Sequence, residues 1–592
     1  MSDYVPPLDD ITFVLNQLCD LEEISRLEPF THADPATVQG IIEEAGRFVA
    51  SAIAPLNHPA DKQGLTLADG VVTTPDGFKE AYAQYVDAGW GAVPFDPEYG
   101  GGGFPWVVGV ALQELLTTAS MAFSMGPLLT QGAIDMLQHH SSAQQKAIYL
   151  PKMLTGEWTG SMNLTEPQAG SDVGALITKA VPADDGTYRI SGQKIFITFG
   201  EHDMAENIIH LVLARTPDAP PGTKGISCFI VPKFLVEEDG SLGTRNGVTC
   251  VSIEHKMGIH ASPTCTLVYE DAVGYLIGDE NQGMRYMFTM MNNARLSVGL
   301  EGLALAERSH QQAVAFAKER RQGRAVGGDP GVQAPIIGHA DVRRMLLTQK
   351  ALIEAMRGLM YLNGRSIDLS LHHPDAAVRQ EHQEIADLYT PLSKAWGTDM
   401  GLEATSLGIQ VHGGMGYIEE TGAAQHFRDA RIPPIYEGTN GIQAMDLVGR
   451  KLPMRGGAVV TEHLDRMDVT AQALAESGDA DLVAIGERLT EGVAACRAAT
   501  GWLVEHGLAD PNDALAGSTP YLRLLATVTG GWVLGQEALA ARRDGAEEPV
   551  AFRDAKVVTA RFFAENVLPS ALGLVHAVTG GAALLYTDAL FD

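Results

Sequence analysis

The sequence predicts an α+β protein of several domains, in which a block of short strands interrupts a mainly helical chain. Apolar residues recur at three- and four-residue steps up to about residue 157 and again from about residue 282, as on one face of a helix. Between these points, short β-rich runs alternate with clusters of Gly, Pro and Asp, a pattern typical of a small all-β domain. A chain of 592 residues with 45% apolar residues can hold several such cores.

These changes of pattern divide the chain into five segments. Asp34 before Pro35 predicts an N-cap with proline at the first helical position, so a short leader ends here. The predicted segments are a leader over 1–35, an N-terminal helical domain over 36–157, a middle β domain over 158–280, a C-terminal four-helix bundle over 281–455 and an additional helical domain over 456–592.

Periodicity places the individual elements within these segments. After a helix that begins at Pro35, helices are expected over 78–89, 106–119 and 131–139. The strands are expected over 188–191, 194–198, 208–214, 226–231, 248–253 and 265–269. The bundle helices are expected over 292–321, 339–363, 379–389 and 392–408, with a break over 323–335. A linker is expected over 453–457, before alanine-rich helical segments over 481–506 and 521–543.

Composition excludes several kinds of partner. The net charge of −31 argues against nucleic acid and anionic membrane surfaces, and an anionic substrate would need a local basic lining. Five scattered cysteines without a CxxC pattern predict reduced thiols in a cytoplasmic protein, with no disulfide framework and no metal site. Residues 1–10 lack the features of a signal peptide, and no apolar run is long enough to span a bilayer.

Glycine-rich segments are the candidate ligand contacts, because glycine lets a backbone approach a ligand closely. The run 100–103 is either a phosphate cradle or, as we favour, an interhelical loop. No GxGxxG follows a strand, and the P-loop, HExxH and GxSxG motifs are absent from the sequence, so nucleotide binding would need another geometry.

The segment around Arg431 carries the main catalytic candidate. Two glycine-rich turns, 410–417 and 433–443, flank a charged link, and the second contains the single carboxylate Glu437. In an apolar cleft such a carboxylate would have a raised pKa and could remove a weakly acidic C–H proton near neutral pH. The residues alone leave open a solvated loop residue or a carboxylate at a helix start.

Three stretches together resemble the acyl-CoA dehydrogenase family. Residues 162–172, MNLTEPQAGSD, are similar to its T-E-P-x-A-G-S-D signature, and residues 436–443, YEGTNGIQ, to its Y-E-G-T-x-x-I-Q signature. Residues 410–414, QVHGG, resemble its Q-x-x-G-G turn, and the helix–β–helix order agrees over about 36–452. The extra C-terminal domain resembles the large branch of the family, and residues 254–265 resemble members that act on 3-(methylthio)propanoyl-CoA.

The resemblance implies an FAD enzyme that removes hydrogens from Cα and Cβ of an acyl-CoA and forms the 2-enoyl-CoA. Glu437 would be the catalytic base, and its backbone N–H would polarise the thioester carbonyl together with a flavin ribityl hydroxyl. An electron-transfer flavoprotein would accept the electrons, and the protein would be a homodimer or a tetramer.

The resemblance also assigns binding residues. Those implied for FAD are Met162, Leu164, Thr165, Gly170, Ser171, Phe196, Thr198, Arg320, Gln410, Gly413, Gly414 and Thr439. Those implied for the acyl-CoA are Ser171, Asn292, Arg295, Glu437 and Gly438. Arg320 matches an arginine that reaches the FAD pyrophosphate of a neighbouring subunit, although by itself it reads as a solvated charge at a helix end.

This sequence departs from the family pattern at three of these places. Phe196 stands where many members have tryptophan, and without the resemblance it would be a β-core residue. Gln322-Gly323-Arg324 lacks the usual phenylalanine after Arg320, which puts the adenine contact in doubt. Asn292 replaces an aspartate near the acyl-CoA pocket and changes the local charge.

Three alternatives to a dehydrogenase of 3-(methylthio)propanoyl-CoA remain open at this point. The first is a dehydrogenase of ordinary fatty acyl-CoA thioesters in β-oxidation. The second is an acyl-CoA oxidase, in which oxygen reaches the reduced flavin. The third is a CoA-binding scaffold without cofactor, and the presence of Thr165, Thr198, Gln410 and Glu437 together argues against it.

Overall fold

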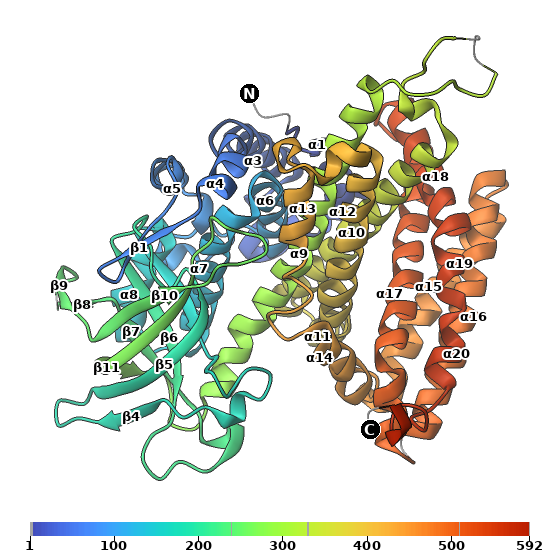
Figure 1. Cartoon of the computed structure of the whole chain (residues 1–592). Coiled ribbons are helices and arrows are strands. Elements are labelled where there is room, and N and C mark those ends of the chain that lie inside the picture. The colour runs from blue at the N-terminus through green and yellow to red at the C-terminus, as the bar shows by residue number, and fades with distance from the viewer. Residues whose placement is uncertain (1–3, 238, 328–330, 508, 591–592) are drawn as a thin grey trace. The chain divides into compact units, whose positions relative to one another are not determined.

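The computed structural model describes residues 4–237, 239–327, 331–507 and 509–590, which form two compact units (Figure 1). Among the described residues, the first unit comprises Glu44–Phe104 and Leu115–Ser297, and the second comprises residues 4–43, Pro105–Glu114 and the chain from Val298. The predicted leader 1–35 and the predicted break 323–335 lie partly outside the described residues.

Helices and a small hairpin form one part of the first unit. Its complete helices are α4 (Asn57–Gln63), α5 (Phe78–Asp87), α7 (Met121–His140) and α8 (Ala143–Thr155). Two further helices, α3 (Pro35–Phe48) and α6 (Trp106–Ala119), contribute residues to both units. The hairpin of β1 (Thr66–Ala68) and β2 (Val71–Thr73) was not predicted.

Two local predictions in this region are confirmed. The Asp34 carboxylate accepts the backbone N–H of Thr37 at 3.1 Å and caps α3. The glycine run 100–103 is a folded loop, because its amides donate to the carbonyls of residues 97, 96, 92 and 95 in turn. A side chain at Gly101 would lie 2.1 Å from the Phe95 carbonyl oxygen, so the loop needs glycine for packing, and its N–H groups are already used.

A seven-stranded sheet forms the other part of the first unit, with order β3-β6-β7-β11-β5-β4 and β10 beside β11 (Figure 1). Its strands are β3 (Trp158–Asn163), β4 (Lys179–Pro182), β5 (Tyr188–Thr198), β6 (Asn207–Ala214), β7 (Ser227–Pro232), β10 (Val248–Ile253) and β11 (Thr264–Leu276). β3 and β6 pair in parallel, and the other strand pairs of this sheet are antiparallel. A separate hairpin joins β8 (Phe234–Val236) and β9 (Leu242–Arg245).

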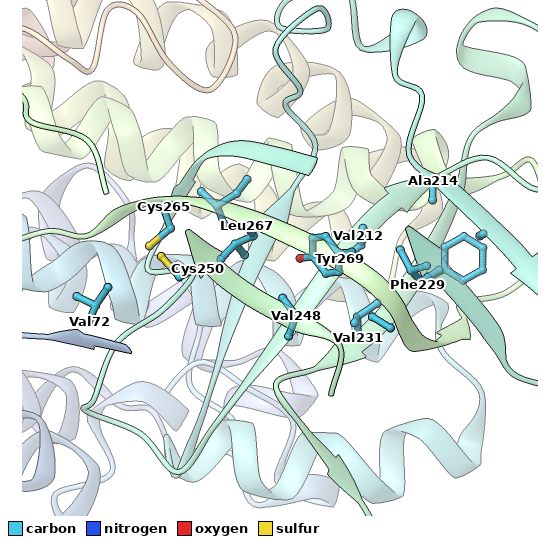
Figure 2. Packing of buried hydrophobic residues seen from close by; sticks show 14 residues of the cluster. Val72, Val212, Ala214, Phe229, Val231, Val248, Cys250, Cys265, Leu267 and Tyr269 are labelled. Carbon is cyan, nitrogen blue, oxygen red and sulfur yellow. The ribbon is translucent and has the colours of Figure 1, made fainter. Parts of the chain in front are cut away.

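The core of the sheet is built from its alternating inward residues. Figure 2 shows Val212, Phe229 and Tyr269 from three different strands among the buried side chains, and Val72 of the small hairpin belongs to the same cluster. The sulfurs of Cys250 and Cys265 face each other at the edge of this cluster. The chain's cysteines are all buried and free.

The second unit is helical. Its bundle contains α9 (Gly283–Glu319) from Val298 onward, α10 (Ala340–His372), α11 (Ala376–Pro391) and α12 (Gly397–His412), with a π-helical turn over Leu392–Trp396. α1 (Leu8–Gln17), α2 (Leu21–Ser25), α13 (Ala423–Ala430) and α14 (Asn440–Asp446) complete this part. The last elements are α15 (Ala458–Glu476), α16 (Ala480–Gly507), α17 (Pro511–Ala541), α18 (Val550–Asn566), α19 (Leu568–Leu572) and α20 (Leu574–Thr579).

The C-terminal helices pack directly on the bundle. α17 lies along α10, and the ammonium of Lys556 on α18 is within 2.7 Å of Asp10, 3.0 Å of Glu537 and 3.5 Å of Glu354. These carboxylates come from α1, α17 and α10, so one buried cation joins four helices. The predicted linker over 453–457 is a short 3-10 turn in which Arg455 has a left-handed backbone.

Several predicted boundaries differ from those in the structure. α7 begins at Met121 rather than at residue 131, and α9 begins at Gly283 rather than at residue 292, because tertiary packing extends helices beyond their periodic stretches. β3 was not predicted, since its sequence WTGSMN is small and polar although most of it is buried. Within the described part of the chain, none of the helices combines the length and apolar character that a membrane span requires.

Candidate active site

Phe196 interrupts the regular pairing of β5. Between the pairs Ile197–Cys265 and Lys194–Leu267, β5 contains one residue more than β11, which defines a β-bulge. Phe196 has φ of +59°, an uncommon value for a bulky residue, and its side chain is 58% exposed. The alternative that Phe196 is a core residue is therefore wrong, because the bulge turns its ring out while Ile197 stays buried.

A buried ion pair ties the bulge to residues 164–166. The Lys194 ammonium donates to the Leu164 carbonyl at 3.0 Å and to the Glu166 carboxylate at 2.8 Å. Burial by itself would raise the pKa of Glu166, but the charge of Lys194 lowers this pKa to about 2. The Glu166 carboxylate is therefore ionised. The Ile195 N–H donates to the Thr165 carbonyl at 2.9 Å. These contacts hold Thr165 and the bulge in one fixed arrangement.

The other site residues assigned by resemblance in the first unit lie at or near its surface. Met162, Thr165 and Thr198 are half-buried, Leu164 is buried, and Gly170 and Ser171 are exposed after the tight turn between Glu166 and Ala169. Arg295 is buried on α9. Its guanidinium donates to the side-chain oxygen of the exposed Asn292 at 3.4 Å.

Glu437 lies in a closed turn of the second unit. Its φ is +55° and that of Gly438 is +78°, two consecutive left-handed residues. The Ile435 N–H donates to the Ile432 carbonyl at 2.8 Å, the Asn440 N–H to the Pro434 carbonyl at 3.1 Å, and the Gln443 amide to the Gly438 carbonyl at 3.0 Å. A left-handed non-glycine residue costs about 1–2 kcal/mol, so this turn is held by its surroundings.

Behind this turn lies a second carboxylate, Glu301 of α9. Its side chain is fully buried, and its Oε2 accepts a hydrogen bond from the Tyr436 hydroxyl. Burial is the main cause that raises the pKa of Glu301, to about 8, and the negative charge of Glu437 raises this pKa further. The hydrogen bond from Tyr436 and the positive charge of Lys394 oppose the increase. Glu301 is therefore mostly protonated at neutral pH.

A polar network holds the other side of the turn. The buried Lys394 ammonium donates to the Asn440 side-chain oxygen at 2.8 Å, and the Asn440 amide donates to Asp399 at 2.8 Å. The same amide donates to the Ala395 carbonyl at 3.1 Å. Because Asn440 begins α14, this network fixes the position at which the turn ends. Thr439 is part of the turn, and its hydroxyl donates to the Pro434 carbonyl at 3.3 Å.

The remaining assigned residues lie at the other end of the bundle. Arg320 is exposed just beyond the end of α9. It lies close to the turn that follows α12, because Val411 of α12 packs with Ala313 and Ala317 of α9. Gln410, Gly413 and Gly414 are exposed on that turn. A side chain at Gly413 or Gly414 would meet no atom of the described residues within 4 Å, and both glycines are exposed.

These two groups of residues are far apart within one chain. α9 runs from Glu301, beside Tyr436, to its end at Glu319 next to Arg320, a rise of about 27 Å. Thus Glu437 and Thr439 form one group, and Arg320, Gln410, Gly413 and Gly414 form another. A single small site in the second unit cannot contain both.

The sequence prediction missed Glu301, Lys194, Glu166 and Lys394 as site residues. Glu166 stands inside the stretch 162–172 and Lys194 begins the expected strand 194–198, so their opposite charges were available as a signal. Glu301 is the single charged residue in the run 296–306, LSVGLEGLALA, and a lone carboxylate in an apolar helix is a signal of a functional or paired group. Nothing in the sequence around Lys394 distinguishes it from a surface lysine.

Four family models match the chain in the order that the fold requires. They are the acyl-CoA dehydrogenase N-terminal domain over 36–157, its middle domain over 161–272, its C-terminal domain over 281–452 and a region described as acetyl-CoA dehydrogenase C-terminal like over 463–587. A 3-methylmercaptopropionyl-CoA dehydrogenase of Ruegeria pomeroyi is 48% identical over 570 residues, which cover 95% of this chain and 96% of that protein. The chain belongs to the acyl-CoA dehydrogenase family.

Two further relatives extend this acyl-CoA dehydrogenase likeness along the whole chain. A butyryl-CoA dehydrogenase of Syntrophomonas wolfei is 36% identical over 604 residues, covering 98% of this chain and 97% of the relative. A solved acyl-CoA dehydrogenase complexed with FAD from Bacillus anthracis has the same fold, with a TM-score of 0.72 and 21% identity over 94% of this chain and 89% of that one. The family, fold class, enzyme class and cofactor predicted from the sequence are confirmed.

The protein is an FAD-dependent acyl-CoA dehydrogenase, and its described residues fit that cofactor. The exposed Phe196 ring on a strained bulge offers an apolar face for a flat ring system. The half-buried hydroxyls of Thr165 and Thr198 offer hydrogen bonds to polar ring edges. The exposed guanidinium of Arg320 beside the open glycine turn suits a pyrophosphate.

Proposed function

We propose that this acyl-CoA dehydrogenase oxidises 3-(methylthio)propanoyl-CoA to the 2-enoyl thioester, with Glu437 as the base that takes the α-proton. The observation that carries the catalytic part is the left-handed turn that contains Glu437, in which the preceding Tyr436 is hydrogen-bonded to the buried Glu301. The substrate part is supported by the 48% identity to the Ruegeria pomeroyi relative, against 36% to the butyryl-CoA dehydrogenase.

The reaction requires two groups of this chain at the reacting carbons. The carboxylate of Glu437 accepts the proton from Cα, and its own backbone N–H donates to the thioester oxygen, on which negative charge develops. FAD, when bound, supplies the acceptor for the hydrogen that leaves Cβ. The carbonyl bond and the new Cα–Cβ double bond then remain in the product.

The other assigned residues would hold the two ligands. Residues proposed for the flavin portion are Met162, Leu164, Thr165, Phe196 and Thr198. Residues proposed for the remainder of FAD are Gly170, Ser171, Arg320, Gln410, Gly413, Gly414 and Thr439. Residues proposed for the acyl-CoA are Ser171, Asn292, Arg295 and Gly438. The buried Lys194–Glu166 pair supports this assignment, because it gives Thr165 and the Phe196 bulge a rigid common frame.

We further propose a homodimer in which Arg320 serves the FAD of the partner subunit. The rise of about 27 Å along α9 between the Glu437 turn and Arg320 supports this arrangement, because one chain does not bring the two groups together. An electron-transfer flavoprotein as electron acceptor follows from the family resemblance. A cytoplasmic location is supported by cysteines that are all buried and free.

A matched pair of thioesters tests the proposed substrate. Pentanoyl-CoA has the same chain length as 3-(methylthio)propanoyl-CoA and differs only by a methylene in place of sulfur. Anaerobic bleaching of the flavin and kcat/KM with an artificial acceptor are measured for both, with butanoyl-, octanoyl- and hexadecanoyl-CoA beside them. We expect kcat/KM to be highest for the thioether by about tenfold or more, the discrimination that one buried group can provide.

Each alternative gives a different result in this experiment. If kcat/KM is higher for pentanoyl- or butanoyl-CoA than for the thioether, the protein is an ordinary short-chain fatty acyl-CoA dehydrogenase. If kcat/KM is highest for hexadecanoyl-CoA, it is a long-chain enzyme. Stoichiometric oxygen consumption during turnover without an acceptor shows an oxidase. A colourless protein that binds CoA thioesters and bleaches with none, even after reconstitution with FAD, overturns the enzymatic proposal.

A further inference from the structure

Glu301 occupies a buried position that the acyl-CoA chemistry described so far does not use. It lies on α9 where that helix crosses α12 at very short range. A side chain at Gly302 would meet the Gly397 carbonyl oxygen at 2.3 Å, and one at Gly401 would meet the Gly302 carbonyl oxygen at 2.5 Å. This backbone-to-backbone contact excludes water, which accounts for the complete burial of the Glu301 side chain.

A buried carboxyl group is costly unless it is paired or neutral. Glu301 has one hydrogen bond, from the Tyr436 hydroxyl to Oε2, and its Oε1 has no hydrogen-bond partner among the described residues. The charged and titratable groups that act on it are Tyr436 and Glu437 of the turn and Lys394 of the π-helical turn. Lys394 donates a hydrogen bond to Asn440, and its positive charge lowers the pKa of Glu301.

The second partner in this arrangement is Tyr436, the residue directly before Glu437. Tyr436 is held at its hydroxyl by Glu301, and burial raises the pKa of Tyr436 far above its usual range, so it stays protonated and donates. Because one peptide bond separates the two residues, the anchored ring restricts the backbone from which the Glu437 carboxylate projects. The left-handed φ of Glu437 needs such an external restraint.

We propose that Glu301 is a positioning residue for the Glu437 base: as a neutral acid it anchors Tyr436, and when it ionises it places a second negative charge behind the base. This inference rests on the proposed role of Glu437. In the neutral form Glu301 adds no negative charge to that of Glu437. In the ionised form the added negative charge raises the proton affinity of Glu437, since like charges disfavour ionisation.

The two forms predict a specific pH dependence. Burial raises the pKa of Glu301 to about 8. Glu301 is therefore neutral below this pH and becomes anionic above it, and the rate of flavin reduction at saturating acyl-CoA should rise through a step near pH 8. The step should be absent from the Glu301→Gln variant, because an amide keeps the hydrogen bond to Tyr436 and does not titrate.

Variants separate the anchoring role from general stability. Flavin content, thermal midpoint, KM and the anaerobic flavin reduction rate are measured for wild type, Glu301→Gln, Glu301→Leu, Tyr436→Phe and Glu437→Gln between pH 6 and 10. We expect Glu301→Leu and Tyr436→Phe to reduce the flavin on the order of 10–10² times more slowly, as for a base displaced by up to an ångström, with KM and flavin content retained. Glu301→Gln should recover most of the rate that Glu301→Leu loses.

Each outcome decides the inference. A pH profile of Glu301→Gln identical to that of wild type overturns it, as do equal rates of Glu301→Leu and wild type. If Glu301→Gln is as slow as Glu301→Leu while flavin content is retained, the anchor is not a hydrogen bond and the inference is also wrong. The Glu437→Gln variant tests the proposed function separately: if it stays active while Glu301→Gln is inactive, Glu301 is the base itself and both statements fail.

Discussion

Glu437 has a backbone conformation that few residues other than glycine adopt. The turn around it is closed by backbone and side-chain hydrogen bonds, and the Tyr436 hydroxyl beside it donates to Glu301 of α9. Phe196 is another residue with a left-handed φ, on a bulge in β5. Strained residues persist where the contacts around them hold the strained conformation in place, and such residues cluster at ligand sites.

The residue-scale prediction concerns Glu437→Gln. Glutamine keeps the shape of the side chain and the backbone N–H, and it cannot accept the α-proton. We expect a yellow, folded protein that binds acyl-CoA and reduces its flavin on the order of 10²–10⁴ times more slowly or worse. Binding of a saturated acyl-CoA should be unchanged or slightly tighter, because a negative charge beside an anionic ligand is removed.

Stopped-flow flavin reduction and a difference spectrum on ligand addition measure the two properties separately. The matched control is Glu419→Gln, an exposed carboxylate of the same unit that pairs with Arg428. The control should keep the wild-type rate. A Glu437→Gln rate above about a tenth of wild type would place the base elsewhere, since it falls outside the range for loss of a positioned base.

At the scale of elements, buried charges join segments that are distant in the sequence. Lys194 connects β5 to the loop after β3, and Lys556 connects α18 to α1, α10 and α17. Lys350 lies 2.5 Å from Glu354, so the second cluster contains two ammonium groups and three carboxyl groups. Burial raises the pKa of Glu537 to about 7, which reduces the excess of negative charge by partial protonation.

The element-scale prediction is that Lys556→Ala destabilises the packing of the C-terminal helices. Removal of one member of a buried ion cluster leaves charge uncompensated and typically costs about 3–5 kcal/mol. The thermal midpoint and the urea midpoint should both fall, and limited proteolysis should cleave first within the C-terminal helices.

Arg561→Ala is the matched control on the same helix. Arg561 pairs with Asp481 and Glu565, and its side chain is 41% exposed, so solvent screens these ion pairs and their loss should change the midpoints much less. Equal midpoints for the two variants would show that the Lys556 cluster contributes no more than a surface ion pair.

At the scale of the whole molecule, one chain separates residues that we propose act on a single FAD. The Glu437 turn lies beside Glu301, and Arg320 lies beyond the far end of the same helix. A symmetric dimer resolves this separation, because each subunit then receives Arg320 from its partner. The dimer remains a proposal, and mixed subunits can test it directly.

The whole-molecule prediction uses two defective parents, Glu437→Gln and Arg320→Ala. In a mixed dimer, the site with an intact Glu437 receives an intact Arg320 from the other subunit, so one of its two sites is wild type. Random exchange makes half of the dimers mixed, and the mixture should therefore recover about one quarter of wild-type activity. Each parent alone should be inactive or poorly loaded with FAD at limiting FAD concentration.

Differently tagged parents are unfolded, mixed and refolded with FAD, or co-expressed, and activity is compared with flavin content and mass in solution. If Arg320 serves its own subunit, no site in the mixture is intact and activity stays at the sum of the parents. A double variant, Glu437→Gln with Arg320→Ala, mixed with wild type is the control for dilution effects.

Much of the site was accessible from contiguous residues. The T-E-P, Q-x-x-G-G and Y-E-G-T stretches each form one turn or strand end, so their chemistry can be recognised without knowledge of the fold. The Asp34 cap and the glycine loop at 100–103 were predicted for the same reason, because a cap and a tight turn depend on neighbours in the sequence. The helix–β–helix order followed from periodicity, which reports the buried face of each element.

The environment of the site could not be predicted in this way. Phe196 was open to interpretation as core because a bulge depends on the register of two strands, and register is set by partners far along the chain. Glu301 was missed because its burial comes from the crossing of α9 with α12 and its hydrogen bond from a residue 135 positions away. Contiguous residues thus predicted which chemistry the chain carries, whereas burial and charge at each group depend on the packing of distant segments, which only the tertiary structure contains.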